Sequence, residues 1–365
     1  MTDKKVTGVF QGDWSAAIQD YPIASGWTYD GGALVVCDSA GGVYVFDAKL
    51  GELLWSERCA HEGGALAMSV HPVEAVFATA GQDGNILIWD LTGAPPRCSI
   101  EVGGGWVENL LWSPDGARLA SSHGREIQIF SVDGTEQWRS DEHLSTVSAL
   151  GWLNSNELVS TCYGRVTIFD AATGEHNERF EWKGSLVSLA LSPDGDVIAC
   201  GSQDNSVHFW RRSTGEDSMM SGYPGKPTAL AFDSTGTLLA TGGGEAVTVW
   251  SFEGNGPEGT YPGSLELHER AVSTLNFTPD GLTLASGGRD GLVFVWSLQS
   301  DGQGRPEGAA MLESVIAEVC WRPDGRALAA LDGDGFVTVW KVSRPDSAAL
   351  AAFDGEGVVT VWKTS

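Results

Sequence analysis

The sequence is poor in basic residues and has no long apolar run. Lysine and arginine together number 22 against 48 aspartates and glutamates, which gives a formal net charge of −26. Such a surface repels phosphate backbones and anionic lipid, so we expect neither nucleic acid nor a membrane as a partner. No apolar stretch approaches the roughly 18 residues that a membrane helix needs. No apolar core follows Lys4 and Lys5, so we expect no secretory signal.

Cysteines are few, and their spacing suggests no pairing. The six cysteines form no CxxC motif, and several lie inside strand-like apolar segments such as 34–39 (LVVCDS) and 197–202 (VIACGS). Such a pattern is typical of buried thiols in a reducing compartment. We therefore expect a cytoplasmic protein.

The motifs of the common catalytic centres are also missing. The sequence has no GxSxG, HExxH or P-loop motif. The glycine triplets Gly103–Gly105 and Gly242–Gly244 open no helix, and phosphate binding by such loops depends on a helix N-terminus. We interpret both triplets as turns, and we expect no catalytic residue, no cofactor and no bound metal.

What the sequence does contain is a repeat. A run of alternating β-branched residues that ends in an aromatic recurs eight times, at intervals of 39 to 46 residues, and the aromatic ends are Phe46, Trp89, Phe130, Phe169, Trp210, Trp250, Trp296 and Trp340. A second apolar strand precedes most of these runs, and a Pro-Asp-Gly turn precedes several of those strands. A period of about 40–45 residues with four short strands predicts one β-propeller blade per repeat.

Two distant repeats each carry a histidine, a hydroxyl residue, an aspartate and a tryptophan, at the same spacings of 18, 4 and 6 residues. The two sets are His61, Thr79, Asp83, Trp89 and His268, Ser286, Asp290, Trp296. On these residues the chain resembles the WD-repeat β-propeller family. The resemblance implies that each set is a buried network that holds its blade together, rather than a catalytic or metal pair. Other repeats keep only part of the set: His143 with Ser160, Trp182 in place of the histidine, and Asp334 with Trp340.

We therefore predict a single all-β propeller of four-stranded antiparallel blades over residues 1–343. The repeat count favours eight blades, and seven, the commoner number in the family, is the alternative. An N-terminal strand is expected to complete the last blade, with Val6–Phe10 as the candidate. Residues 344–365 duplicate 322–343 with 16 of 22 positions identical. We expect this copy to be a partial blade or an edge hairpin that could support self-association.

Family geometry also sorts the loops. Loops that enter the first strand and turns between the second and third strands share one face, the top. The residues expected on this top rim are Trp106, Gln82, Gln203, Arg289, Arg270, His123 and Tyr163. Aromatics and arginine are enriched at binding hot spots, so these residues form a candidate docking patch. Packing of Trp106 and Tyr163 between blades is the competing interpretation.

The resemblance and the missing motifs favour a non-catalytic scaffold that docks a protein or peptide on the top face. Two alternatives remain open. One is a propeller enzyme with its site at the central channel, and the other is a metal- or redox-linked accessory protein that uses Cys59 and His61. Converging ionisable groups would favour the first alternative, and facing Cys and His side chains would favour the second.

Overall fold

A computed structural model describes residues 6–103, 105–254, 256–281, 283–343, 349–353 and 359–363. Within these ranges every regular element is a β-strand. No helix in this part of the chain is long and apolar enough to cross a membrane. The chain divides into two compact units, Ile18–Pro227 and Met1–Ala17 with Thr228–Ser365. The second unit therefore combines residues from both ends of the sequence.

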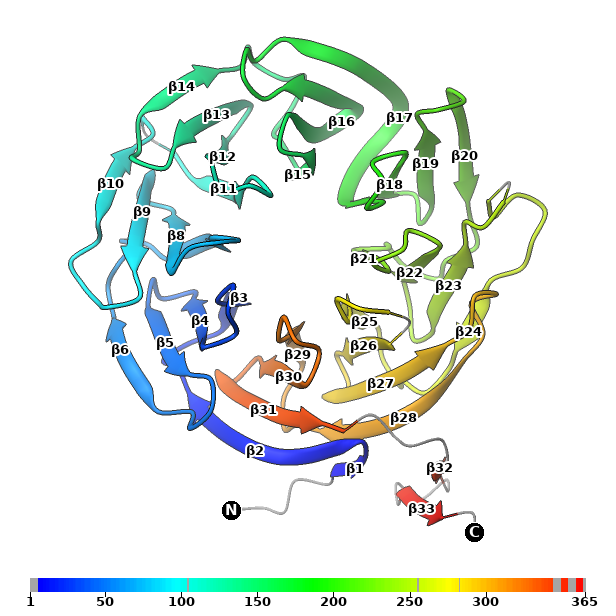
Figure 1. Cartoon of the computed structure of the whole chain (residues 1–365). Coiled ribbons are helices and arrows are strands. Elements are labelled where there is room, and N and C mark those ends of the chain that lie inside the picture. Colours follow the sequence, from blue (N-terminus) through cyan, green and yellow to red (C-terminus); the bar gives the residue numbers. More distant parts are fainter. Residues whose placement is uncertain are drawn as a thin grey trace. The chain divides into compact units, whose positions relative to one another are not determined.

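The Ile18–Pro227 unit begins with three antiparallel four-stranded sheets, each built from strands in sequence order. Their strands are β3 (Pro22–Trp27), β4 (Ala33–Asp38), β5 (Val43–Asp47), β6 (Leu53–Glu57), then β7 (Ala65–Val70), β8 (Val76–Gly81), β9 (Asn85–Asp90), β10 (Cys98–Glu101), then β11 (Val107–Trp112), β12 (Arg118–His123), β13 (Glu126–Ser131), β14 (Glu136–Arg139). Within this unit β3, β7 and β11 lie on the inner side and β6, β10 and β14 on the outer side (Figure 1).

A six-stranded sheet follows, formed by β15 (Ala149–Asn154), β16 (Glu157–Asp170), β17 (His176–Leu191), β18 (Val197–Ser202), β19 (Val207–Arg211) and β20 (Glu216–Met220). Two of its strands are unusually long. The first part of β16 pairs with β15 and the rest with β17. The last part of β17, from Leu186 onward, pairs with β18. Each of these two strands therefore fills two strand positions, and the sheet holds the fourth and fifth repeats together.

The second unit contains three sheets of four or five strands. One is formed by β21 (Ala229–Phe232), β22 (Leu238–Gly242), β23 (Val247–Ser251) and β24 (Gly263–Leu265). The next is formed by β25 (Val272–Phe277), β26 (Thr283–Gly288), β27 (Leu292–Leu298), β28 (Gly304–Met311) and, at its edge, β1 (Val6–Gly8). The last is formed by β29 (Ile316–Trp321), β30 (Ala327–Asp332), β31 (Phe336–Val342) and β2 (Phe10–Ala17).

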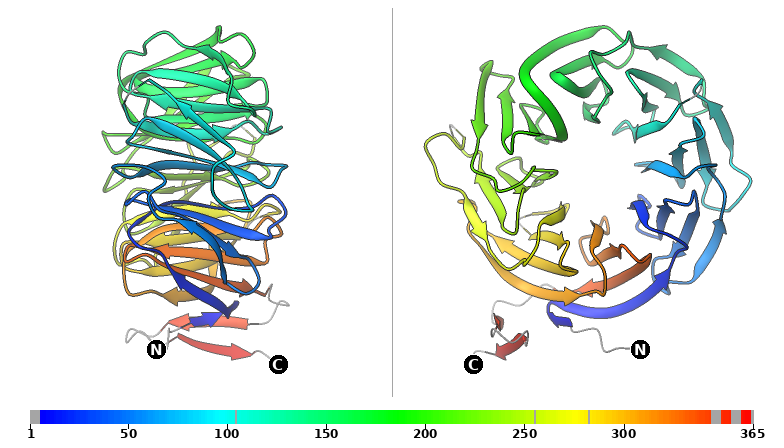
Figure 2. Two further views of the ribbon diagram at one scale, coloured as in Figure 1. Left: turned by 90° about the vertical axis from the view of Figure 1, so that its left-hand side faces the viewer. Right: turned by 180° about the vertical axis from the view of Figure 1, so that it is seen from behind.

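The blades of a β-propeller are thus present, as the repeats predicted. Seven sheets of four or more strands are described, so a count of sheets gives the alternative, seven, whereas a count of repeats gives eight. The eight repeats are accommodated because the six-stranded sheet carries two of them. In each repeat four strand positions are filled. Figure 2 shows the sheets of each unit from behind.

The strand completing the last blade is not the one expected. Val6–Phe10 was the candidate, but β2 (Phe10–Ala17) pairs with β31, from Phe10↔Val342 to Ala17↔Phe336. β1 instead pairs with β28 at the edge of the neighbouring sheet. A fourth strand has one face exposed to solvent, so a polar segment such as FQGDWSAA suits the position. The prediction that an N-terminal strand contributes to the last blade is confirmed, and its boundaries are corrected.

The core lies between successive sheets. The middle strands β4, β8 and β18 are buried at all six of their residues. Ile88 of one sheet, for example, belongs to the same buried cluster as Leu110 and Phe130 of the next. Strands covered on both faces are expected to be continuously apolar, which explains segments such as VFATAG and VIACGS.

In the C-terminal duplicate, β32 (Ala349–Phe353) and β33 (Val359–Lys363) form a two-stranded antiparallel sheet of their own. The assignment of 344–365 as a partial blade or an edge hairpin, and its role in self-association, stay predictions. All four strand positions of the last blade are filled by other residues.

Deletion of residues 344–365 should leave the melting temperature nearly unchanged, because the last blade is complete without them. Circular dichroism or differential scanning fluorimetry on the full and shortened chains would measure the difference. A large drop in melting temperature would show that the fold depends on the second copy.

Candidate functional site

The first complete set of four residues forms one hydrogen-bonded chain. The indole Nε1 of Trp89 donates to Oγ1 of Thr79 at 2.9 Å. That hydroxyl lies 2.8 Å from Nε2 of His61, whose Nδ1 lies 3.1 Å from Oδ1 of Asp83. Since the threonine oxygen accepts from the indole, its own proton is available for Nε2, and Nδ1 then carries the proton that is donated to Asp83. This assignment makes the imidazole neutral and uses both ring nitrogens.

The second set repeats this geometry. Nε2 of His268 lies 2.8 Å from Oγ of Ser286, which also accepts from Nε1 of Trp296 at 2.9 Å. Nδ1 of His268 lies 3.1 Å from Oδ2 of Asp290, and the backbone amide of Leu292 donates to the same carboxylate. Both histidines are buried. These arrangements connect a loop, a strand and a turn, and they leave no ring nitrogen available for catalysis or metal binding.

The repeats that keep only part of the four-residue set form different contacts. His143 contacts Ser160 at 3.0 Å, but its Nδ1 lies 2.9 Å from the backbone oxygen of Arg125, because no turn aspartate is available. In the fifth repeat Trp182 stacks on His208, with ring centroids 3.8 Å apart.

The turn of the eighth repeat requires a correction. Asp334 was the expected network aspartate, but the buried carboxylate that accepts backbone amides is that of Asp332. It receives the amides of Asp334 and Phe336 at 3.1 and 3.0 Å. Asp38 of the first repeat holds its turn in the same way, through the amides of Ala40 and Gly42. A carboxylate before the turn can accept the turn's backbone amides without a histidine. The family spacing therefore pointed to Asp334 instead of Asp332.

Three buried histidines make the fold sensitive to acid. Burial lowers the pKa of His61, His143 and His208 below the usual value of 6.5. The unfolded chain therefore takes up protons at these positions before the folded chain does. Their contribution to stability is complete above pH 6.5 and is lost as the pH falls below that value toward the folded pKa values.

The free energy of unfolding, measured by urea titration, should therefore fall as the pH is lowered below about 6.5, by up to about 1.4 kcal/mol per pH unit for each histidine. His143→Gln should flatten this pH dependence, whereas His176→Gln, at an exposed position, should not. An equal slope in the two variants would contradict the assignment.

The second network can be tested against a matched position. Asp290→Ala should reduce the free energy of unfolding by about 1–3 kcal/mol, because a buried His268 loses its acceptor. Asp204 occupies the same turn position in the fifth repeat but is exposed. Asp204→Ala should therefore change the free energy by no more than about 0.5 kcal/mol. Chemical denaturation of both variants would reveal the difference, and similar losses would be inconsistent with a special role for the network.

A recurring backbone hydrogen bond places loops and turns on one face of the Ile18–Pro227 unit. The amide of Ala60, before β7, donates to Gly41 in the preceding turn at 2.9 Å. Val102, before β11, donates in the same way to Gly84 at 3.0 Å. We call the surface formed by these loops and turns the loop face. It corresponds to the top rim of the sequence analysis for this unit.

The loop that carries Trp106 passes over His123 on the loop face. Trp106 is 54% exposed and follows Gly103 and Gly105, whose φ angles are +108° and +125°. A Cβ placed on Gly105 would lie only 3.3 Å from Cδ2 of His123, so the loop runs directly over this ring. Glu108, beside it, is partly buried, and burial raises the pKa of its carboxyl group, opposed by the charge of His123. Trp106 thus projects into solvent from a fixed support.

The other expected residues of this unit lie far apart in the sequence, Gln82 and Gln203 in turns and Tyr163 within β16. Tyr163 is 57% exposed, and its amide donates to Oγ of Ser145 at 2.8 Å. The amide of Gln82 donates to Gly64, and that of the exposed Gln203 donates to Ser185. The interpretation that Trp106 and Tyr163 are buried between blades does not agree with their exposure. The docking role of all these residues stays a prediction.

Two expected residues belong to the other unit. Arg270 and Arg289 are both exposed, and the amide of Arg289 donates to the carbonyl of Ala271 at 2.9 Å. This bond joins the loop before β25 to the turn after β26. The two arginines therefore form a group of their own within that unit.

The sequence analysis missed three exposed apolar residues of the loop face: Tyr21, Ile23 and Leu144, which are 41%, 36% and 59% exposed. Tyr21 accepts the amide of Ser39 from its neighbouring turn, and Leu144 directly follows His143. Their position at the entry to a first strand, shared with Trp106, is the signal that could have found them.

The chemical alternatives receive little support from the described residues. Among them, no three His, Cys, Asp or Glu side chains converge in a way that could hold a metal ion. His61 is buried with both ring nitrogens engaged, whereas Cys59 is exposed, so the two do not form a ligand pair. Burial raises the pKa of the Cys200 thiol, which makes it a poor nucleophile.

Comparison with known proteins agrees with the networks. The family model described as "WD domain, G-beta repeat" matches residues 259–297, which contain the second complete set. This match and the curated relatives support a WD-repeat β-propeller family. A second model, described as "Outer membrane protein assembly factor BamB", matches residues 10–219, more than half of the chain. WD-repeat proteins of this kind are typically non-catalytic interaction scaffolds.

Several curated WD-repeat relatives are similar over part of their length. Actin-interacting protein 1 of Caenorhabditis elegans is 26% identical over 292 residues, which are 77% of this chain and 46% of that protein. Serine-threonine kinase receptor-associated protein of Gallus gallus is 24% identical over 45% of this chain and 48% of its own length. Periodic tryptophan protein 2 of Arabidopsis thaliana is 27% identical over 58% and 24%. The chain spans less than half the length of each of these relatives.

The crystal structure of the computationally designed Ika8 protein is similar in fold. It superposes with a TM-score of 0.77 and 22% sequence identity, and the match covers 89% of this chain and 98% of that one. This likeness concerns the fold alone.

Proposed function

We propose that this WD-repeat protein is a non-catalytic scaffold that docks a protein or peptide on the loop face of its Ile18–Pro227 unit. The observation that carries the proposal is the exposure of Trp106 and Tyr163 on that face. Tyr21, Ile23 and Leu144 add exposed apolar surface to it. Large aromatic side chains supply much of the binding energy in protein interfaces, and an exposed cluster of them suits a partner better than solvent.

The backbone that carries Trp106 and Tyr163 is held in place by hydrogen bonds, and this favours binding. The loop that carries Trp106 is held at Val102 by the turn of the preceding blade and lies over His123. The backbone of Tyr163 is held by Ser145. Side chains presented by a fixed backbone lose less conformational entropy when a partner binds. A rigid blade scaffold with variable loops is well suited to this role.

The charge of the chain narrows the partner class. A formal net charge of −26 opposes phosphate backbones and anionic lipid surfaces. A protein or peptide with basic groups near its apolar anchor would be attracted instead. One relative is named Telomerase protein component 1 (Mus musculus), so the experiment below includes a nuclease arm. The six cysteines are free thiols, which supports our proposal of a cytoplasmic location.

The combined variant Trp106→Ala with Tyr163→Ala should lose the partner while the melting temperature stays nearly the same, because both side chains are more than half exposed. Affinity capture from a lysate of the source organism, read by mass spectrometry, would compare this variant with the parent chain. Tyr29→Ala is the matched control: Tyr29 is 47% exposed in the turn between β3 and β4, away from the loop face.

We expect the parent chain and the Tyr29→Ala control to retain the same protein and the double variant to lose it. Equal capture by all three chains would count against the loop face as the docking site. If nuclease treatment released the retained material from the parent chain, the partner would be a nucleic acid rather than a protein.

A further inference from the structure

The two copies of the C-terminal duplication form hairpins with the same internal register. In the last blade β30 pairs with β31 from Ala327↔Lys341 to Leu331↔Val337. In the second copy β32 pairs with β33 from Ala349↔Lys363 to Phe353↔Val359. Each pair in the second hairpin is the corresponding pair of the first, shifted by 22 residues. The two hairpins therefore match in backbone pairing as well as in sequence.

Sequence identity between the copies is concentrated where the first hairpin is buried. Residues 327–332 and 337–340 are buried in the last blade, and within these two segments only Leu331 differs, being replaced by Phe353. The remaining five differences lie in the turns or at the strand end, and they replace Gly325, Arg326, Asp334, Phe336 and Val342. The second hairpin thus carries nearly all the side chains that the core of the last blade requires.

We propose that the two hairpins are alternative occupants of one slot, the space between β29 and β2 in the last blade. In the structure the first hairpin fills it, pairing with β29 through Leu328↔Trp321 and with β2 through Thr338↔Ser15. In the alternative state Leu350 and Thr360 take these register positions, and residues 322–343 form a loop between β29 and the second hairpin.

The same differences explain why the first hairpin is the preferred occupant. Gly325 has a φ of +66°, and the second copy has Ser347 at this position, where a side chain is strained. Leu331 is fully buried, and its replacement by the larger Phe353 crowds a packed core. Closing a loop over residues 322–343 adds an entropic cost that grows only slowly with length. The alternative state is therefore disfavoured without being forbidden.

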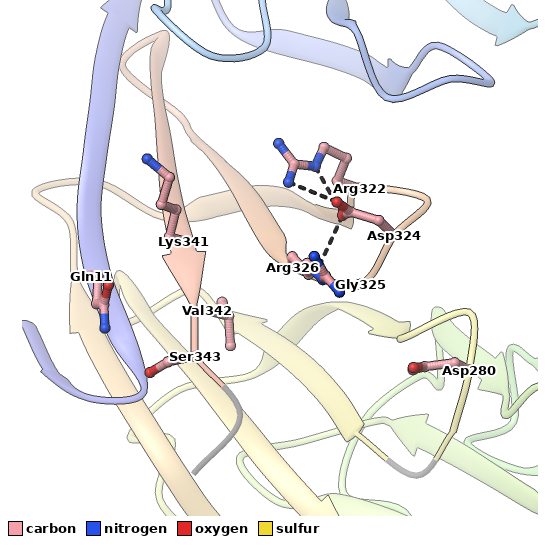
Figure 3. A pocket seen from close by; sticks show the side chains of 9 residues that line it. All are labelled: Gln11, Asp280, Arg322, Asp324, Gly325, Arg326, Lys341, Val342 and Ser343. Carbon is pink, nitrogen blue, oxygen red and sulfur yellow. Dashed lines mark hydrogen bonds and ion pairs between the residues drawn. The ribbon is translucent and has the colours of Figure 1, made fainter. Parts of the chain in front are cut away.

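The exchange would alter a surface pocket of this unit. A pocket of about 540 Å³ is lined by Gln11, Asp280, Arg322, Asp324, Gly325, Arg326, Lys341, Val342 and Ser343. All but Gln11 and Asp280 come from the first copy, and Arg322 forms a two-pronged ion pair with Asp324 (Figure 3). Alanine stands where Arg326 would be in the second copy. Exchange would thus lower the formal charge of the pocket from +1 to zero, so occupancy of the slot sets the charge of this surface.

Pairs of introduced cysteines can report which hairpin is in the slot. Oγ of Ser15 lies 3.5 Å from Oγ1 of Thr338, and the two residues are register partners. In the full chain, Ser15→Cys with Thr338→Cys should form a disulfide readily under mild oxidation, because it reports the observed state. We call this bond the first-hairpin disulfide.

A second pair of substitutions reports the alternative state. Ser15→Cys with Thr360→Cys can form an intramolecular bond, which we call the second-hairpin disulfide, only when the second hairpin occupies the slot. Peptide mapping by mass spectrometry quantifies both disulfides. The two chains share the substitution at Ser15, so they differ only in which hairpin carries the second thiol.

Weakening the first hairpin should shift the populations. Gly325→Ala strains the first copy mildly, and Trp340→Ala removes a buried ring from it. Each should raise the yield of the second-hairpin disulfide several-fold and lower that of the first-hairpin disulfide. Trp362→Ala, the matching change in the second copy, should abolish the increase. The mild Gly325→Ala variant keeps the test decisive if Trp340→Ala fails to fold.

The proposal is overturned if the yield of the second-hairpin disulfide in the Gly325→Ala background does not rise above that of the same chain with Trp362→Ala. It is also overturned if this disulfide forms only between two chains, seen as a dimer on a non-reducing gel. In that case the second hairpin would insert into another molecule rather than into its own slot.

Discussion

The structure depends on one constraint: the middle strands of each blade must be covered on both faces. Strands such as β4 and β8 are buried at every residue, and the clusters that bury them combine side chains of successive sheets. A single blade would leave two apolar faces in water, so no repeat is stable alone. Everything else in the molecule, including its polar networks and exposed loops, is arranged around this stacking.

The buried histidine networks follow from the same constraint. Because the sheets exclude water, any polar group between them needs a partner. His61 and His268 meet this need as neutral rings that connect a loop to a strand and a turn. Trp106 lies outside the stack, in a loop that is held at Val102 by a backbone hydrogen bond to Gly84. This separation lets residues of the loop face change without disturbing the networks that stabilise the blades.

Structure could be predicted from the sequence where burial restricts the residue types. It was harder to predict at solvent-exposed positions, which tolerate many residue types. Trp89 and Trp296 are buried, as are the histidines of the two His–Asp spacings, so their positions could be predicted. Most residues of the outer strand β2 are exposed or partly exposed, so burial imposes little pattern on it, and Val6–Phe10 was predicted in its place. Asp332 was missed because a turn can be held by a carboxylate on either side of it. The exposure of Tyr21 and Leu144 depends on three-dimensional packing that spacing does not record.

The C-terminal duplication shows how far burial can specify a structure locally. The last blade holds a hairpin through its buried side chains and its register, and the second copy has the same register and nearly the same residues at the positions that are buried in the first. Four of the six differences lie at exposed or partly exposed positions of the first copy: Arg326, Asp334, Phe336 and Val342. The difference in stability between the two hairpins in the slot therefore arises at Gly325 and Leu331, the two buried positions at which the copies differ. A fold built from repeats offers each slot to any hairpin of the right pattern, and small differences in packing and turn strain decide which one fills it.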